Sequence, residues 1–197
     1  MARQFTKIAF TDGVKKIQEH YGSREMYENV AKRGVSEDTL TPREIDFIAA
    51  RDSFYMGTVN SNGWPYIQFR GGSKGFLKVL DPQTLGFVDF QGNLQYLTVG
   101  NLSENDRVFL FLMDYANRKR LKIWGHAQVI SDNPELLNQL ADPNYEAELG
   151  RVFLIKIEAL DWNCPQHIPL RYSEEEVTQM LKHLQKRIKE LEAKLGE

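Results

Sequence analysis

The stretch DWNCPQH, residues 161–167, combines residue types that can do chemistry within a short span. Cys164, the only cysteine of the chain, lies three residues before His167. A thiolate beside a histidine base is a nucleophile, and both residue types bind metals. However, no third group that would orient the histidine is evident. The other histidines give no recognisable metal-ligand spacing; they are His20, His126 and His183.

We therefore predict no metal site, and a thiol nucleophile at Cys164 stays an alternative. The simpler interpretation is a proline-bent segment that follows a strand and buries Cys164 as a structural residue. In that case Trp162 and His167 are still available to line a pocket.

A second stretch, QFRGGSKGF, residues 68–76, places Arg70 before two glycines. Glycines let the backbone approach a ligand closely, and nearby amides can bind an anion. The alternative is a glycine-rich hairpin whose arginine is solvated.

A third stretch, DFQGNLQYLTVGNL, residues 89–102, has the pattern of a strand end, a turn and a helix start. We expect Asn93 to cap a helix over residues 93–105. Free N–H groups at a helix N-terminus bind phosphate. The polar side chains of the first turns could then bind a ligand: Gln95, Tyr96 and Thr98. An ordinary capped helix between two strands is the alternative.

A fourth stretch, NRKRLKIWG, residues 117–125, alternates basic residues at the start of a strand. Arg118, Arg120 and Lys122 are therefore expected to share one face. Such a cluster can clamp a phosphate. It can equally be a solvated basic edge that discourages aggregation.

The elements that must position these groups change character along the chain. Before residue 53 the pattern is helical, with a capping box at Thr41 and Glu44 around Pro42. From Ser53 short apolar segments predict strands, and Asn62-Gly63 predicts a hairpin turn. Helices are expected over 93–105 and 134–141. The strands favour an antiparallel barrel; they are residues 53–60, 66–72, 75–81, 85–90, 107–114, 120–131 and 151–162.

The C-terminal segment predicts a separate amphipathic helix that begins after Ser173. Its apolar residues alternate spacings of four and three, which is a heptad seam nearly three heptads long. The seam can pack on the chain's own barrel or contact a second subunit. Its residues are Val177, Leu181, Leu184, Ile188, Leu191 and Leu195.

Composition limits the function classes. The 197 residues carry a formal charge of −2, which does not attract nucleic acid or anionic lipid over the whole surface. No apolar run is long enough for a membrane span, and the N-terminus lacks the apolar region of a signal peptide. We expect no nucleic-acid or membrane partner and a cytoplasmic location.

Taken together, several stretches resemble the pyridoxamine 5'-phosphate oxidase-like family of FMN-binding split barrels, and within it the oxidase-related FMN-binding proteins. The resemblance is carried by GWPYIQFRGGSKGFLKVLD, GFVDFQGN, VGNLSENDRVFLFLMD, RLKIWGHAQV and DWNCPQHIP. It implies a mainly-β split barrel with flanking helices. The expected organisation is a helical segment packed on the barrel over 1–52, the FMN-binding barrel over 53–170 and an amphipathic helix over 171–197.

The resemblance also implies a homodimer with FMN at the subunit interface. One group of residues would follow the isoalloxazine and ribityl chain: Gln68, Phe69, Arg70, Gly71 and Gly72. A second group would lie near the phosphate: Gln91, Asn93, Gln95, Tyr96 and Thr98, with Arg120 or Lys122. The stretch DWNCPQH of the partner would cover the flavin edge through Trp162, Gln166 and His167, with Cys164 as filler.

The sequence departs from true pyridoxamine phosphate oxidases at LQYLT, residues 94–98, where the family carries an Arg-Lys pair for the phosphate. FMN binding is therefore expected, and oxidation of vitamin B6 is not. The implied activity is redox chemistry at the flavin with a small organic substrate or a nicotinamide donor. His167 is the candidate acid or base.

Three alternatives stay open. The same barrel could bind haem, with His126 or His167 as the axial ligand. It could bind a deazaflavin in a more basic groove. It could also be a non-catalytic dimer that stores or senses flavin, or that serves as a scaffold.

Overall fold

The computed structural model describes residues 4–32, 38–162 and 164–196. The chain forms two compact units. The first comprises Met1–Met113 and Arg120–Asn163, and the second comprises Asp114–Lys119 and Cys164–Glu197.

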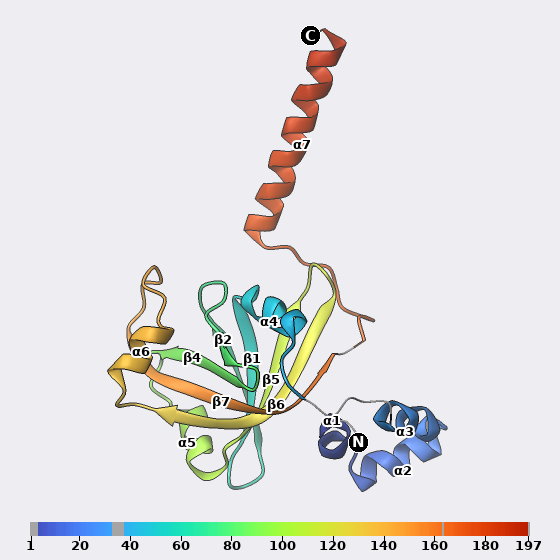
Figure 1. Ribbon diagram of the computed structural model, residues 1–197, viewed down its shortest axis with the longest axis vertical. Coiled ribbons are helices and arrows are strands. Elements are labelled where there is room, and N and C mark those ends of the chain that lie inside the picture. The colour runs from blue at the N-terminus through green and yellow to red at the C-terminus, as the bar shows by residue number, and fades with distance from the viewer. Residues whose placement is uncertain (1–3, 33–37, 163, 197) are drawn as a thin grey trace. The chain divides into compact units, whose positions relative to one another are not determined.

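One seven-stranded sheet in the order β2-β1-β5-β6-β7-β4-β3 organises the first unit (Figure 1). Neighbouring strands pair antiparallel in the registers β1–β2, β1–β5, β3–β4, β4–β7 and β6–β7. The mainly-β split barrel with flanking helices predicted from the sequence is confirmed. The strands are β1 (Ser53–Val59), β2 (Pro65–Gly71), β3 (Lys78–Asp81), β4 (Thr84–Phe90), β5 (Arg107–Asp114), β6 (Lys119–Ile130) and β7 (Leu149–Trp162).

The core lies on the inner face of this sheet. Side chains alternate between the two faces of a strand, so β5 buries every second residue from Val108 to Asp114. At the centre Phe87 stacks on Phe153 with ring centroids 4.9 Å apart, and Phe54 meets Phe87 edge-on at 5.4 Å. Aromatic contacts of this kind add to the free energy gained from burial alone.

The hairpin between β1 and β2 forms at the predicted Asn62-Gly63 turn. Gly63 adopts φ +80°, a left-handed conformation that favours glycine. The Asn60 side chain accepts hydrogen bonds from the backbone N–H groups of Asn62 and Trp64. The turn therefore fixes the register that sets Gln68 against Met56.

Helix α4 (Pro42–Ala49) begins at the predicted capping box. The Thr41 backbone N–H donates to Glu44 Oε2 at 3.0 Å. Glu44 is buried, and its other oxygen accepts a hydrogen bond from Trp162 Nε1 of β7 at 2.6 Å. Burial acts to raise the pKa of Glu44, but the hydrogen bonds from Thr41 and Trp162 outweigh it and lower that pKa. This carboxylate thus connects α4 to the last strand.

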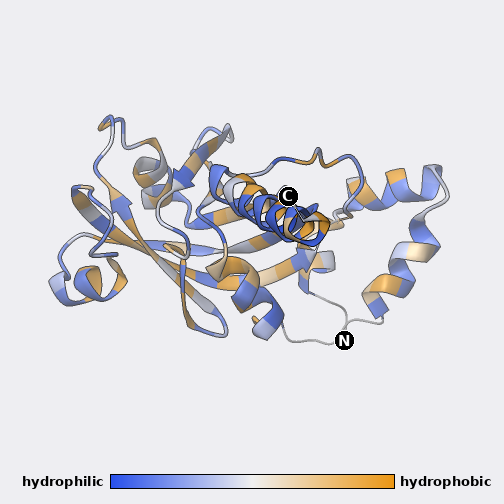
Figure 2. Cartoon of the chain, turned by 90° about the horizontal axis from the view of Figure 1, so that it is seen from above, coloured by the Kyte–Doolittle hydropathy of each residue, from blue (hydrophilic) through white to orange (hydrophobic). Residues whose placement is uncertain are grey.

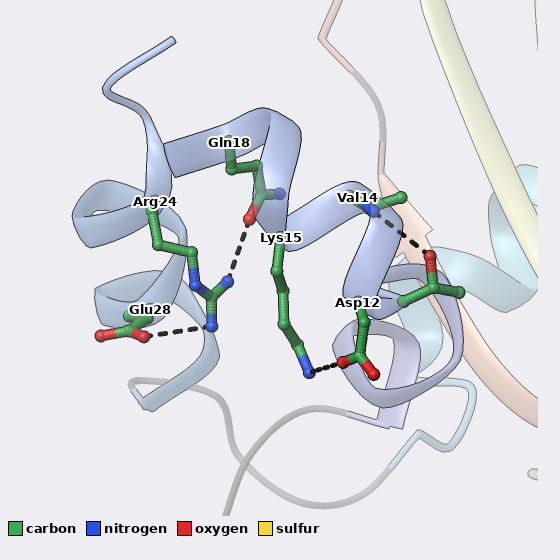
Figure 3. Close-up of polar contacts among 7 residues, drawn as sticks. Asp12, Val14, Lys15, Gln18, Arg24 and Glu28 are labelled. Atoms are coloured by element: carbon green, nitrogen blue, oxygen red, sulfur yellow. Dashed lines mark hydrogen bonds and ion pairs between the residues drawn. The ribbon is translucent and has the colours of Figure 1, made fainter. Parts of the chain in front are cut away.

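The N-terminal helices are α1 (Gln4–Ala9), α2 (Asp12–His20) and α3 (Arg24–Lys32). The Phe5 ring of α1 lies 5.7 Å from the Trp124 ring of β6. Arg24 joins α3 to α2, because its guanidinium donates to Gln18 at 2.9 Å and also pairs with Glu28 (Figure 3). Whether residues 1–52 form a separate segment packed on the barrel stays a prediction.

Helix α5 spans Leu97–Glu104, so it begins later than predicted. Asn93 is not its cap, since its side chain accepts instead from the Gln95 backbone N–H at 3.2 Å. The cap is Tyr96, with φ +52°. Helix α6 (Pro134–Leu140) starts as expected and is capped by the Asn133 side chain.

In the second unit, α7 (Glu174–Leu195) begins with a capping box between Ser173 and Glu176. Cys164 is exposed, so its interpretation as a buried structural residue is wrong. Asn163 of the same stretch lies outside the described residues. Among the described helices, none is both long and apolar enough to cross a membrane.

The contact between α4 and β7 can be tested with Trp162→Phe. This change keeps the ring edge against Phe47 but leaves one oxygen of the buried Glu44 carboxylate without its donor. We expect the free energy of unfolding to fall by about 1–3 kcal/mol in urea denaturation. The control Trp64→Phe changes an exposed ring and should cost less than about 0.5 kcal/mol. Equal effects would contradict the role of the hydrogen bond.

Candidate functional site

A cavity of about 420 Å³ opens between β2, the end of β4, the start of β7 and the segment that leads into α5. This volume is within the range of small-molecule sites. Its lining residues are Tyr66, Gln68, Arg70, Asp89, Phe90, Gln91, Gly92, Asn93, Leu94, Gln95, Tyr96, Leu97, Thr98, Val99, Gly150 and Arg151.

An ion pair between Arg70 and Asp89 forms the wall of this cavity. It joins β2 to β4, two strands that are not neighbours in the sheet. Both side chains are largely buried, with 11% and 15% of their surface exposed. Arg151 of β7 adds a second guanidinium, whose Nε lies 3.9 Å from Asp89 Oδ2.

Burial dominates the electrostatics of this cluster. It raises the pKa of Asp89, and the attraction of Arg70 and Arg151 partly offsets the rise. Burial also lowers the pKa of Arg70, while Asp89 acts in the opposite direction. A guanidinium stays protonated at neutral pH regardless. With Asp89 ionised, two cations therefore face one anion, and the cluster carries a net positive charge that suits an anionic ligand.

Arg70 retains an unused donor. Its Nε is buried and has no hydrogen-bond partner among the described residues. The guanidinium carbon lies 5.2 Å from the Phe153 ring centroid and 5.8 Å from that of Phe87. This Nε has almost no accessible surface, so it is enclosed by the protein, although the Arg70 residue itself lines the cavity.

Helix α5 is held by contacts from distant strands, and the segment before it has an unusual backbone conformation. The Thr98 hydroxyl donates to Gln68 Oε1 of β2 at 2.5 Å, and Asn101 Nδ2 donates to the Thr58 hydroxyl of β1 at 2.9 Å. Leu94 and Tyr96 both have positive φ, at 59° and 52°. Such conformations cost about 1–3 kcal/mol each and are concentrated at functional sites.

Gly150 permits the close approach of β7 to the end of β4. A Cβ at this position would lie 2.9 Å from the Asp89 carbonyl oxygen, which is too short for a real contact. Glycine here lets Arg151 reach Asp89 and lets its guanidinium lie 4.9 Å from the Tyr96 ring centroid.

The structure brings together seven of the residues proposed from the sequence: Gln68, Arg70, Gln91, Asn93, Gln95, Tyr96 and Thr98. Phe69 is not among them, because alternation along β2 turns it to the opposite face, where it is 58% exposed. Gly71 and Gly72 do not line the cavity either. A Cβ on Gly72 would lie 2.9 Å from the Phe76 ring and one on Gly71 3.0 Å from the Phe69 ring, so both glycines make room for phenylalanine.

The basic residues of β6 lie elsewhere in the first unit. Lys122 Nζ pairs with Asp161 Oδ2 of β7 at 2.7 Å. Arg120 is on the same face of β6, and its Nε is buried without a partner among the described residues. Arg118 lies before the strand and has φ +51°, so it does not follow the strand's alternation. Of the three basic residues predicted to share one face, only Arg120 and Lys122 do so.

None of the described residues of DWNCPQH, the first two of which belong to β7, lines the cavity. Trp162 is held by Glu44 and packs edge-on against Phe47 at 4.8 Å. Gln166 and His167 are exposed residues of the second unit, and His167 has φ +62°.

Sequence reasoning missed the residues Tyr66, Asp89, Gly150 and Arg151 as parts of this site. One signal was present, because Asp89 is a charged residue within the apolar strand LGFVDF. A carboxylate in such a position is rarely buried without a cationic partner.

Outside the cavity, the outer face of β2, β1 and β5 exposes an apolar surface, which we call the sheet face. Cross-strand register aligns Ile67, Gly57 and Phe109 in one row. The next row contains Phe69, Tyr55 and Phe111. Ile67 is 68% exposed and Tyr55 is 39% exposed. Contiguous apolar surface of this kind marks an interaction site.

His126 lies between two carboxylates. Its Nδ1 is 3.0 Å from Asp106 Oδ2 and its Nε2 is 3.1 Å from Glu158 Oε2. The hydrogen bond that Asp106 accepts from His126 raises the pKa of His126, and Glu158 adds to the effect, although burial acts against it. Carboxylates accept hydrogen bonds, so this position favours a proton on each ring nitrogen, an arrangement that would leave no lone pair for a metal.

The fold agrees with comparisons to known proteins. The profile of the pyridoxamine 5'-phosphate oxidase family matches residues 40–163, more than half of the chain. The chain therefore belongs to the pyridoxamine 5'-phosphate oxidase family. Among curated proteins, no sequence matches.

Solved structures share the fold at low sequence identity. The Group A Streptococcus protein HupZ is 15% identical, with a TM-score of 0.52 over 68% of this chain and 100% of its own. A protein from Lactobacillus delbrueckii, whose name refers to pyridoxamine 5'-phosphate oxidase, is 21% identical. Its TM-score is 0.50 over 64% of this chain and 97% of its own.

The cluster around His126 predicts a pH dependence. Because the folded-state pKa lies above the ordinary value of 6.5, the stabilisation is complete below that value and is lost as pH rises through the folded pKa. The effect should be below about 1 kcal/mol, because these groups are partly exposed. NMR titration should give a midpoint above 6.5 for His126, and Asp106→Asn should lower it. A wild-type midpoint at or below 6.5 would show that the carboxylates do not hold the proton.

Proposed function

We propose that this chain is an FMN-binding flavoprotein, and that the cavity beside Arg70 binds the cofactor. The observation that carries the proposal is the pair of guanidiniums, Arg70 and Arg151, around the single carboxylate of Asp89 in a cavity of ligand size. FMN combines a flat ring with a phosphate, and this cavity offers both a strand wall and a basic end.

The residues present fit the two parts of FMN. Arg70 and Arg151, which both line the cavity, would hold the phosphate together with the amides that precede α5. Tyr66 and Gln68, two residues apart on β2, would lie along the ring and ribityl chain. Arginines from β2 and β7 would thus replace the Arg-Lys pair that the family carries and that LQYLT of this chain lacks.

We further propose a homodimer formed through the sheet face. Phe69 and Ile67 are exposed on it, and Tyr55 meets Phe69 edge-on at 5.7 Å. In this arrangement Phe69, Arg120 and Lys122, which do not line the cavity of their own chain, would be available to the cofactor of the partner. The same applies to Trp162, Gln166 and His167, which the family resemblance assigns to the partner's flavin edge.

The cofactor would supply hydride or electron transfer, and the protein would supply its position and electrostatics. Thr98 and Gln68 are hydrogen-bonded to each other, so they would orient the ligand rather than move protons. Asp89 is engaged by two arginines. His167 therefore stays the candidate acid or base. The proposed reaction partner of the flavin is a small organic substrate or a nicotinamide donor.

The haem alternative gains no support from His126, because both of its nitrogens face carboxylates. Haem binding would therefore depend on His167. Identifying the bound cofactor distinguishes the deazaflavin alternative from FMN binding. Turnover with reduced nicotinamide distinguishes an enzyme from a non-catalytic dimer. A cytoplasmic location remains part of the proposal.

FMN titration of the cofactor-free protein, followed by flavin fluorescence, tests the site. Wild type should bind FMN, and Arg151→Ala should weaken binding by about 10- to 100-fold because a charge-assisted hydrogen bond is lost. The matched control is Arg107→Ala, which removes an exposed arginine of β5 that is not part of the cavity. Wild type that fails to take up FMN would overturn the proposal. Equal affinities of the two variants would show that Arg151 does not hold the phosphate, while FMN binding itself would stand.

The dimer is tested with Phe69→Lys, which places an ammonium within the sheet face. Sedimentation should show a dimer dissociation constant at least about tenfold above that of wild type, because an apolar contact is replaced by a buried charge. Leu80→Lys changes an exposed apolar residue on β3, outside the sheet face, and should leave the constant unchanged. An unchanged constant for Phe69→Lys would place the interface elsewhere.

A further inference from the structure

Helix α7 presents a complete apolar seam. The helix has 22 residues, which corresponds to about 33 Å, and none of its described residues is buried. In Figure 2 hydrophobic residues, in orange, recur along α7 among hydrophilic ones, in blue. The seam residues are exposed by 42–77%: Val177, Leu181, Leu184, Ile188, Leu191 and Leu195.

A helix of this length depends on packing for its stability. Isolated helices are marginal in water, and most helical stability in proteins comes from burying an apolar face. The capping box at Ser173 and the left-handed Gly196 fix both ends of α7. They do not bury the seam, so the helix requires an apolar surface against it.

The side-chain types at the seam favour a particular occupant. With Val177, Leu184 and Leu191 at heptad position d, Leu181, Ile188 and Leu195 fall at position a. Leucine at d with a β-branched residue at a is typical of parallel two-stranded coiled coils. The three central layers, Leu184, Ile188 and Leu191, follow this rule, whereas the outer a positions hold leucine and the first d position holds Val177.

Charge complementarity points to the same arrangement. Position g before the second a contains Arg187, and the e position five residues later contains Glu192. In a parallel pair of identical helices these two residues face each other across the seam, twice by symmetry. An antiparallel pair sets g against g, and the g positions hold Met180, Arg187 and Lys194, with no acidic residue. Within one chain Arg187 pairs with the exposed Glu190 at 3.3 Å, a contact that is easily exchanged.

From these features we infer that α7 forms a parallel two-stranded coiled coil with α7 of a second copy of this chain. The pairing does not depend on FMN, because the seam lies outside the cavity and outside the sheet face. It adds a second self-association surface to the chain, at its C-terminal end.

Single-cysteine cross-linking of the full-length chain tests the inference. In a Cys164→Ser background, cysteine is introduced at one d position at a time as Val177→Cys, Leu184→Cys or Leu191→Cys. These positions are about 10 Å apart along the helix. Only a parallel pair brings each into contact with its own copy at a separation that a disulfide can span. Lys186→Cys, on the outer face, is the matched control.

Mild oxidation should join all three d-position variants at least about tenfold faster than the control. An antiparallel pair would join at most one of the three, and a seam packed on its own chain would join none. Either result overturns the inference, as does a control that cross-links equally fast.

A charge exchange provides an independent readout. In the Leu184→Cys variant, Arg187→Glu should slow cross-linking by about threefold, since it sets two acidic residues together. Adding Glu192→Arg should restore the original rate by reversing the pair. A double variant that is slower than the single one would contradict the parallel pairing.

Discussion

The cavity depends on one ion pair, because Arg70 and Asp89 connect two strands that the sheet itself does not join. In the order of strands, β2 is at one edge and β4 is next to the other. The hydrogen-bond ladders hold each strand to its neighbours, whereas side chains span the gap between these two. Removing either partner would leave a charge buried without its counterpart, a change that typically costs about 3–5 kcal/mol. The site and the closure of the fold therefore share the same two residues.

The remaining contacts of the site follow from this pairing. With β2 held close to β4, Gln68 meets Thr98, and the start of α5 is placed over the cavity. Gly150 then lets β7 run close enough for Arg151 to share Asp89. The result is a basic pocket built from three strands and a strained loop. The opposite faces of some of the same strands remain apolar and exposed, so the cavity and the proposed dimer surface use alternate residues of β2.

Local features could be predicted from the sequence, and features set by strand order could not. The capping box at Thr41 and Glu44 and the turn at Gly63 depend on residues a few positions apart, so short patterns identify them. Helix α5 begins at Leu97 instead of Asn93, and Thr98 in its first turn is hydrogen-bonded to Gln68, thirty residues away, a contact that no local pattern reveals. Lys122 was expected near the phosphate, but the β6–β7 register pairs it with Asp161, which no local pattern reveals. The partnership of Asp89 with Arg151 was invisible for the same reason.

The position of Gly150 and Arg151 in the chain has a consequence for how the protein is made. Both belong to β7, the last strand of the sheet, whereas the other walls of the cavity come from residues 66–99. Domains are synthesised from the N-terminus and generally fold as units. A nascent chain that has released β2 and β4 still lacks β7, and with it Arg151, one of the two cations that face Asp89 in the complete protein. The pocket is thus among the last features to form, and during its completion α7 is the segment still being synthesised.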